Sequence, residues 1–371
     1  MHIHQHSEQE IMKYISKYID SSYTIKPEWG MGPHPLFLDI ETTGLSAGRS
    51  MIYLIGTARP EGDKLHFMQW LAEGPEDERA VIKAAFSEIT PETTVITFNG
   101  ETFDLPFIER RAKRFRLPYA FDYNKSFDLL KKLRPLKKLL GLPRCSQKSF
   151  EAFLGMPRED KEDGGALIRV YWDYVRNHSE QLAHLFLIHN EEDVLNMAGV
   201  ATLLSYRPLQ YGELSAAKLI ETECADGALN AALRVSENVP VQLDFSRNIL
   251  RGRIRNDLLT LSLPIADTSL YYFFKDYKNY YYIPEQDTAV HQSVGEFIPK
   301  EQRVQAKKET ARVKKNGLFI PCAGIARPGL HLYREAPGTQ AYLSLSEIDT
   351  GNPAFWNQFI SEDLPLILSG E

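Results

Sequence analysis

The sequence predicts an α/β domain, a mixed sheet covered by helices, followed by a smaller, strand-rich α+β domain. Three strand-like apolar segments follow one another between residues 35 and 71, and strand and helix patterns then alternate up to about residue 204. Pro208 and Gly212 interrupt the helical pattern just beyond this point. With 371 residues, 43% of them hydrophobic and 25% charged, the chain is long enough for two domains.

The domain boundaries follow from these breaks. Ahead of the first strand we expect a helical extension over residues 1–30, because Ile11, Ile15 and Ile19 recur at a helical spacing. The α/β domain is assigned to residues 31–208 and the α+β domain to residues 214–371.

The elements of the α/β domain follow from local patterns. Pro75 and the acidic residues after it predict the start of a helix from Glu76 to Ile89. A long helix is expected to carry the register Leu182, Phe186, His189, Asp193, Met197, which is apolar except for the histidine and the aspartate. Strands are expected at 35–40, 51–58, 64–71, 94–98 and near Phe127, and further helices beyond Asp104, at 147–154 and at 165–176.

The α+β domain is expected to begin with a helix at 214–235 and to continue with strands at 239–244, 256–264, 269–275 and 279–284. The last two strands are rich in Tyr and Phe and predict an aromatic hairpin. Its rings either fill the core of the hairpin or stack unpaired bases, at ~1–3 kcal/mol for each base. Because basic residues gather over 300–315, an accessory nucleic-acid-binding surface is our hypothesis for this domain.

Four carboxylates stand where an ionised group is costly. Asp39 and Glu41 close an apolar strand and share one face of it. Asp104 follows the strand at 94–98, and Asp193 lies on the apolar register of the long helix. A lone ionised carboxylate that faces a core is strongly destabilising without a cation. Four of them from three segments predict a site for hard divalent metal ions, Mg²⁺ or Mn²⁺.

Each of these signals also has a structural explanation. His189 and Asp193 could form an ion pair on a helix face, Asp104 could cap a helix, and Glu41 could face solvent. Three motifs in this order and at the spacing of a domain favour the functional interpretation.

The motifs resemble a known superfamily. Asp39-Ile-Glu-Thr-Thr-Gly-Leu45, Asn99-x4-Asp104-Leu-Pro and His189-Asn-x-x-Asp193-Val resemble the three exonuclease motifs of the DEDD superfamily, which has a ribonuclease-H-like fold. The spacing is similar to that in the proofreading domains of family B polymerases, where a tyrosine stands at the position of His189. Histidine at this spacing is expected of the predicted bacterial exonucleases of the YprB type. The resemblance covers residues 34 to about 204.

The resemblance implies an exonuclease that removes nucleotides from single-stranded 3′ ends with two divalent metal ions, Mg²⁺ or Mn²⁺. His189 would orient or deprotonate the attacking water. The metal ligands would be Asp39, Glu41, Asp104 and Asp193. The residues that would hold the terminal nucleotide are Thr42, Thr43, Gly44, Leu45, Asn99 and Phe103.

Two more acidic residues lie close to these motifs in the sequence. Asp128 opens a helical pattern after a short apolar segment, so we interpret it as a helix cap or as a group behind the metal ligands. Glu101 is expected to face solvent.

Positive charge is concentrated in one region. The whole chain has a net charge of −6, which argues against non-specific coating of nucleic acid. Residues 110–148 hold thirteen Lys and Arg against two Asp. Arg110, Arg111, Lys131 and Lys132 are predicted to bind phosphates. The alternative is the solvated face of two amphipathic helices.

The remaining features concern the compartment. Cys145, Cys224 and Cys322 are widely spaced and form no C-x-x-C, so neither a zinc site nor a disulfide framework is predicted. No apolar stretch has membrane-spanning length, and no signal peptide precedes the first strand. We therefore expect a cytoplasmic protein that binds nucleic acid, either DNA or RNA, and no membrane.

Two other functions are compatible with the same fold. One is a catalytically idle nucleic-acid-binding or scaffolding protein, against which the presence of all four carboxylates argues. The other is a structure-selective endonuclease. Asn99, Phe103 and the run from Thr42 to Leu45 favour the exonuclease, and a circular substrate would distinguish the two.

Overall fold

The computed structural model describes residues 12–21, 23–160, 164–247 and 249–370. The chain divides into two compact units, Met1–Leu204 and Ser205–Glu371, which we describe separately.

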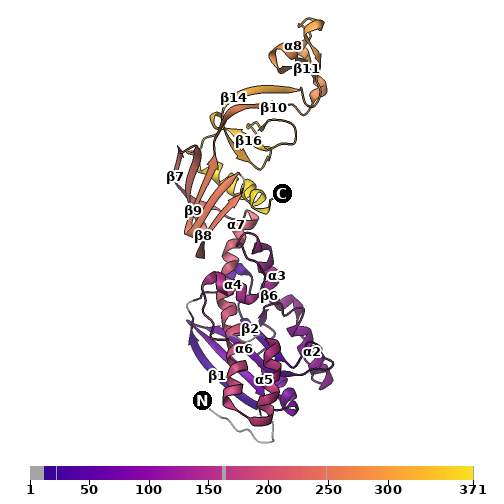
Figure 1. Cartoon of the computed structure of the whole chain (residues 1–371), viewed down its shortest axis with the longest axis vertical. Coiled ribbons are helices and arrows are strands. Elements are labelled where there is room, and N and C mark those ends of the chain that lie inside the picture. Colours follow the sequence, from indigo (N-terminus) through magenta and orange to yellow (C-terminus); the bar gives the residue numbers. More distant parts are fainter. Residues whose placement is uncertain (1–11, 22, 161–163, 248, 371) are drawn as a thin grey trace. The chain divides into compact units, whose positions relative to one another are not determined.

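The first unit contains one six-stranded sheet in the order β1-β4-β3-β2-β5-β6 (Figure 1). β4, β3 and β2 follow β1 in antiparallel pairs, whereas β5 and β6 continue the sheet parallel to β2. The predicted mixed sheet is therefore confirmed. The strands are β1 (Met12–Asp20), β2 (Pro35–Thr42), β3 (Ile52–Glu61), β4 (Lys64–Ala72), β5 (Thr94–Thr97) and β6 (Ser126–Asp128).

Helices cover this sheet, as predicted. α5 and α6 lie side by side, and α6 contacts both β2 and β3 (Figure 1). The apolar run Leu36, Phe37 and Leu38 is at most 2% exposed, so β2 lies in the core. The helices are α1 (Glu78–Phe86), α2 (Asp104–Arg114), α3 (Leu129–Leu133), α4 (Gln147–Leu154), α5 (Gly164–Asn177) and α6 (Glu180–Ala201).

The predicted helical extension over residues 1–30 is wrong where the structure describes it. Residues 12–20 form β1, which pairs with β4 along its whole length, and residues 1–11 lie outside the described segments. The ring of Tyr14 stacks on that of Trp70, with centroids 5.7 Å apart. The isoleucine spacing of four is even, so Ile15 and Ile19 share a face of a strand just as they would share a face of a helix.

The second unit is strand-rich, as predicted, and contains three small sheets. β7 (Ala216–Ala225), β8 (Ala228–Arg247) and β9 (Leu250–Pro264) form an antiparallel sheet. β10 (Ala266–Phe273), β14 (Arg312–Cys322), β15 (Tyr333–Arg334) and β16 (Ala341–Ser344) close into a barrel. β11 (Tyr280–Ile283), β12 (Thr288–His291) and β13 (Val304–Gln305) form the third sheet.

The helices of this unit are short. They are α7 (Arg207–Tyr211), α8 (Gln292–Gly295), α9 (Pro353–Gln358) and α10 (Leu364–Ser369), with a π-helical turn at Phe359–Asp363 between the last two. Across the parts of both units that the structure describes, no helix is long and apolar enough to span a membrane.

The predicted helix at 214–235 is wrong. β7 and β8 occupy this range and are joined by a turn at Asp226 and Gly227, both with positive φ (50° and 72°). Such an Asp-Gly pair is the strongest short-range signal for a two-residue hairpin turn. Along β8 the buried residues alternate from Leu229 to Val235, a period of two that the helical assignment overlooked.

The predicted aromatic hairpin is also wrong. β10 pairs with β14 and β15, whereas β11 pairs with β12 and β13, so the two aromatic segments belong to different sheets. Their rings still meet locally, since Phe274 stacks on Tyr280 with centroids 4.0 Å apart.

Candidate metal centre

Three elements bring the acidic motifs together at the carboxyl end of β2. Strand alternation places Asp39 and Glu41 on the face of β2 against which α6 packs. α6 approaches the sheet closely because Gly56 of β3 has no side chain: a Cβ there would lie 2.1 Å from Oδ1 of Asn190. Asp104 opens α2, and its Oδ1 accepts a hydrogen bond from the backbone N–H of Ile40 at 3.2 Å.

His189 lies between two of the carboxylates. Its Nε2 is 3.5 Å from Oε1 of Glu41 and 3.4 Å from Oδ2 of Asp193. The three residues offer ligand atoms that all lie within 4.8 Å of one another. The structure thus brings the strand motif and the helix motif into one cluster.

The electrostatics of the cluster call for a cation. Burial, followed by repulsion from Asp104, Asp193 and Glu41, holds the pKa of Asp39 well above its usual range. The pKa of Glu41 is raised well above its usual range too, by burial and then by the same two aspartates. Burial raises the pKa of Asp104 to about 7, against the hydrogen bonds that it accepts. Carboxylates with unfavourable burial and mutual repulsion are a donor set that fits divalent metal ions.

The carboxylates and the histidine are held in place by further polar groups. Asn190 donates a hydrogen bond from Nδ2 to Oδ2 of Asp39 at 2.8 Å, and Gln69 in turn donates to Asn190 at 2.8 Å. Nδ1 of His189 is 2.8 Å from Oδ2 of Asp160. This network fixes which atoms point into the site.

Sequence reasoning missed Arg158 and Asp160, which lie in the loop between α4 and α5. Nη1 of Arg158 is 2.7 Å from Oδ1 of Asp193 and 3.0 Å from Glu151, and its Nη2 is 3.3 Å from Asp160. Burial opposes the charge, but Asp193 and Glu151 outweigh it and raise the pKa of Arg158. The loop carries no periodic pattern, and the signal in the sequence was the cluster of charged residues Arg158-Glu159-Asp160.

The structure confirms the interpretation of Asp128 but not that of Glu101. Asp128 is a helix cap, as predicted: its Oδ1 accepts hydrogen bonds from the backbone N–H groups of Leu130 and Asn99, both at 3.0 Å. The prediction that Glu101 faces solvent is wrong. Glu101 is half-buried, accepts a hydrogen bond from Ser126 at 3.0 Å and pairs with Lys131.

The candidates for holding a terminal nucleotide lie in two loops at this edge of the sheet. The Thr42 hydroxyl donates to the Gly44 carbonyl at 3.0 Å, and the Thr43 hydroxyl accepts from the backbone N–H of Met51 at 3.0 Å. Leu45 is 89% exposed. In the second loop Asn99 adopts a left-handed backbone conformation (φ 68°), and Phe103 packs near the Phe107 ring.

The predicted phosphate-binding residues separate into two groups. Arg110, Lys131 and Lys132 are exposed. Arg111 is 5% exposed, pairs with the buried Glu78 and donates to the Ala47 carbonyl at 3.1 Å. The prediction that Arg111 binds phosphate is therefore wrong, because helix periodicity turns it inward while its neighbour Arg110 faces outward.

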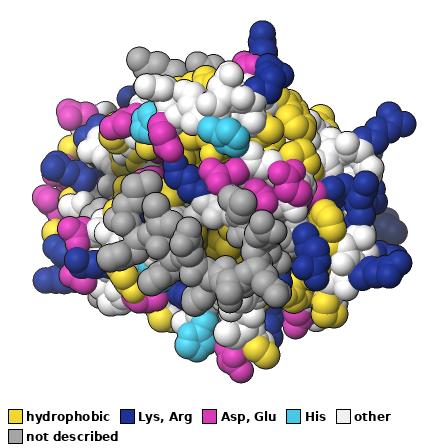
Figure 2. All heavy atoms as spheres, turned by 90° about the horizontal axis from the view of Figure 1, so that it is seen from below, with side chains coloured by type: hydrophobic (Ala, Val, Ile, Leu, Met, Phe, Trp, Pro, Cys, Tyr) yellow, Lys and Arg dark blue, Asp and Glu magenta, His cyan; other side chains and the backbone are white. Residues whose placement is uncertain are grey.

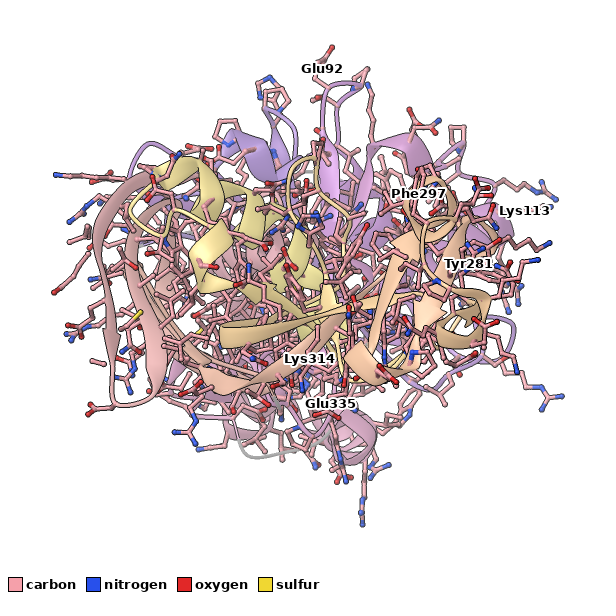
Figure 3. All side chains as sticks on the ribbon, turned by 90° about the horizontal axis from the view of Figure 1, so that it is seen from above. Glu92, Lys113, Tyr281, Phe297, Lys314 and Glu335 are labelled. Carbon is pink, nitrogen blue, oxygen red and sulfur yellow. The ribbon has the colours of Figure 1, made fainter. Side chains whose placement is uncertain are left out.

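The basic residues are spread over more than one part of the surface. On the face seen in Figure 2, Lys and Arg side chains mix with acidic ones on the left, and several lie close together on the right. Lys113 of α2 projects outward, as Figure 3 shows. The aromatic rings of the second unit are largely engaged, since Arg303 lies 4.4 Å from the Tyr281 ring and Arg312 lies 4.0 Å from the Tyr271 ring.

Comparisons with known proteins agree with this fold. Residues 36–205 match the sequence model of the RNase_H superfamily, which confirms the predicted ribonuclease-H-like fold. A curated relative, the "Uncharacterized protein YprB" of Bacillus subtilis (strain 168), is 33% identical over 177 residues. The matched segment covers 47% of this chain and 42% of the relative, so the chain spans less than half of that protein.

Solved nucleases are similar only at a distance. A structure described as the apo form of the nuclease shares 14% identity over 51% of this chain and 80% of that chain, with a TM-score of 0.33. Exonuclease I of E. coli in complex with a dT13 oligonucleotide shares 18% identity over 44% of this chain and 45% of that chain, with a TM-score of 0.29.

Proposed function

We propose, from the premise that residues 36–205 form a domain of the RNase H superfamily, that this protein is a metal-dependent exonuclease. It hydrolyses phosphodiester bonds of DNA or RNA from single-stranded 3′ ends. The domain arrangement that goes with this activity is a catalytic unit over residues 31–208 and an accessory nucleic-acid-binding unit over residues 214–371.

One observation carries the proposal: acidic groups from β2, α2 and α6 meet at one edge of the sheet. Burial and mutual repulsion make this cluster unfavourable by itself. A protein that needed only a stable core would be more stable with apolar residues at these positions, because a buried charge without a partner is strongly destabilising.

Asp39, Glu41, Asp104 and Asp193 would hold two divalent metal ions. When bound, the ions lower the pKa of a coordinated water and stabilise the attacking and leaving oxygens of the displacement. The chain itself positions these ligands: Asn190 orients Asp39, and Arg158 holds one oxygen of Asp193.

The surroundings of the cluster would bind the substrate. The loop from Thr42 to Leu45 follows β2, and Asn99 and Phe103 lie in the loop that follows β5, so both loops border the same edge of the sheet. Leu45 is 89% exposed and is free to contact a terminal base. The exposed Arg110, Lys131 and Lys132 supply positive charge for phosphates.

The test is cleavage of 5′-labelled single-stranded DNA and RNA with Mg²⁺ or Mn²⁺. We expect a metal-dependent ladder that shortens from the 3′ end and is absent with Asp39→Asn and Asp193→Asn. Glu92→Gln, which changes an exposed carboxylate away from the cluster (Figure 3), is the matched control and should cleave normally. Cleavage of a circular single strand would instead indicate an endonuclease, and binding without cleavage would indicate an idle scaffold.

A further inference from the structure

Each of the three clustered ligands has one atom anchored by a different side chain. The Tyr53 hydroxyl is 3.4 Å from Oε2 of Glu41. Asp160 binds Nδ1 of His189, and Arg158 binds Oδ1 of Asp193. The atoms left over, Oε1 of Glu41, Nε2 of His189 and Oδ2 of Asp193, face one another.

Nε2 of His189 faces two carboxylate oxygens at distances longer than a charge-assisted hydrogen bond. Its distances of 3.5 Å and 3.4 Å to the two carboxylate oxygens exceed the roughly 2.7–2.9 Å of a charge-assisted hydrogen bond. The Nδ1 contact to Asp160, at 2.8 Å, falls within that range. The side chain of His189 is only 8% exposed, and its Nε2 lies between two carboxylates.

Asp160 determines which ring nitrogen carries the proton. A carboxylate accepts, so Nδ1 is the donor in this contact; in the neutral tautomer that this contact favours, Nε2 carries the lone pair and faces Glu41 and Asp193. A carboxylate, a histidine and a metal ion in this order are the usual outer-shell arrangement of histidine ligands. The side chain of Asp160 is 1% exposed, which keeps this contact away from water.

The separations of the three atoms suit a shared ion. Ligand atoms about 2.1 Å from one metal ion and at right angles to each other are roughly 3 Å apart. The observed 3.4 Å and 3.5 Å are slightly wider, so small side-chain movements would bring the atoms to ligand spacing.

We propose that His189 is a metal ligand, whose Nε2 binds one divalent ion together with Glu41 and Asp193. Asp160, Arg158 and Tyr53 act as positioning residues. The inference rests on the proposed metal-dependent function and changes the expected role of His189, because a nitrogen bound to metal has no lone pair left for the proton of the attacking water. A nitrogen ligand favours a transition metal such as Mn²⁺ over Mg²⁺, which prefers oxygen.

Pulsed electron paramagnetic resonance of the full chain loaded with Mn²⁺ tests the ligand directly. We expect a ¹⁴N coupling to the bound Mn²⁺ that changes to ¹⁵N when the protein is grown with ¹⁵N-histidine. His189→Ala should remove the coupling. His184→Ala, which changes an exposed histidine on the same helix, should keep it. Bound Mn²⁺ without any nitrogen coupling in the unmodified protein would overturn the proposal.

Affinity gives a second readout. His189→Ala and Asp160→Asn should each weaken Mn²⁺ binding by about tenfold, while Mg²⁺ binding, measured by competition in the same titration, should change much less. An equal loss of affinity for Mn²⁺ and Mg²⁺ would contradict the expected preference of this site for Mn²⁺. If the unmodified protein binds Mn²⁺ and degrades DNA but shows no nitrogen coupling, only the role of His189 fails. If it binds no divalent ion at all, the proposed function fails with it.

Discussion

At the scale of single residues, Arg158 contacts carboxylates from several segments of the chain. Its guanidinium contacts Glu151, Asp160, Asp193 and, through Nε at 3.2 Å, Glu192. The side chain is 10% exposed, and Glu151 and Asp160 are each 1% exposed. One cation therefore compensates several buried carboxylates at once, which is the condition under which an ion pair matters most.

Arg158→Met should destabilise the first unit by about 3 kcal/mol, because it removes the guanidinium from buried carboxylates, of which Asp160 keeps its ion pair with Lys148. Chemical denaturation monitored by circular dichroism measures the change. Arg176→Met is the matched control, since Arg176 pairs with Asp173 on the surface of α5, and it should have little effect. A change of less than about 1 kcal/mol in Arg158→Met would show that water or another group replaces the guanidinium.

Arg110 and Arg111 are neighbours with opposite expected effects. Arg111→Met should cost about 3 kcal/mol of stability, because it breaks the buried pair with Glu78, and should leave nucleic-acid affinity unchanged. Arg110→Met should leave stability unchanged and reduce the slope of log Kd against log salt concentration by about one. Chemical denaturation and salt-dependent binding are measured on both variants. A loss of stability in Arg110→Met, or a smaller salt dependence in Arg111→Met, would contradict these roles.

Metal ions should stabilise the protein. Mg²⁺ or Mn²⁺ is expected to raise the melting temperature, because a bound cation relieves the repulsion among Asp39, Glu41 and Asp104, and EDTA should reverse the shift. Differential scanning fluorimetry of Asp104→Asn should show a smaller shift than the unmodified protein, whereas Glu92→Gln should match it. An identical shift in Asp104→Asn would remove Asp104 from the set of ligands.

At the scale of elements, the packing of α6 on the sheet places the helix motif opposite the strand motif. Gly56 of β3 lets Asn190 and Val194 approach the backbone, and a Cβ there would lie 2.9 Å from the Val194 side chain. α6 carries His189 and Asp193 at fixed positions relative to Asn190, so the distance between helix and sheet sets the geometry of the candidate metal centre.

Gly56→Ala should therefore push α6 away from β3. We expect a loss of stability of about 1–3 kcal/mol from overpacking, together with weaker Mn²⁺ binding. Gly164→Ala, at the start of α5 where a Cβ would meet no atom within 4 Å, is the control and should change neither property. Calorimetric Mn²⁺ titration of both variants measures the effect, and unchanged affinity in Gly56→Ala would mean that the metal ligands tolerate a shift of the helix.

For the whole molecule, our hypothesis gives the second unit the role of binding longer substrates. Most of its rings contact cations or other rings within the unit, but Phe297 is 89% exposed (Figure 3). Lys300, Lys307 and Lys308 follow in the same segment and are exposed. An exposed ring and exposed lysines in one segment are the residue types that surfaces for single strands use.

Phe297→Ala should weaken binding of long single strands, because a stacked base contributes about 1–3 kcal/mol. Cleavage of oligonucleotides of a few bases should be unaffected. Val294→Ala, which shortens another exposed side chain nearby, is the control. Fluorescence anisotropy with strands of increasing length measures the difference, and equal affinity of Phe297→Ala and the unmodified protein would exclude this surface from substrate binding.

The sequence by itself predicted the mixed sheet of the first unit apart from β1, and it named acidic residues that the structure brings together. Segments with the hydrophobic periodicity of strands alternate with segments that have the periodicity of helices, and this order predicted the mixed sheet. The prediction is possible because the spacing of apolar residues shows which face of an element is buried. Asp39, Glu41 and Asp193 could be named because a carboxylate in an apolar pattern needs an explanation. Local spacing could not distinguish a helix from a strand where both place the same residues on one face. Ile15 and Ile19, four positions apart, are such a case.

Only the tertiary structure decided which partners these residues meet. Arg158 and Asp193 are 35 positions apart in the chain, and Tyr53 reaches Glu41 from a neighbouring strand. The burial of Arg111 against Glu78 and the contact of Asp160 with His189 likewise join separate elements. Periodicity predicts which side of an element is buried. It does not predict which side chain packs against that face, because the partner comes from an element that is distant in sequence. For His189 this partner is Asp160, and the chemistry of the imidazole depends on it.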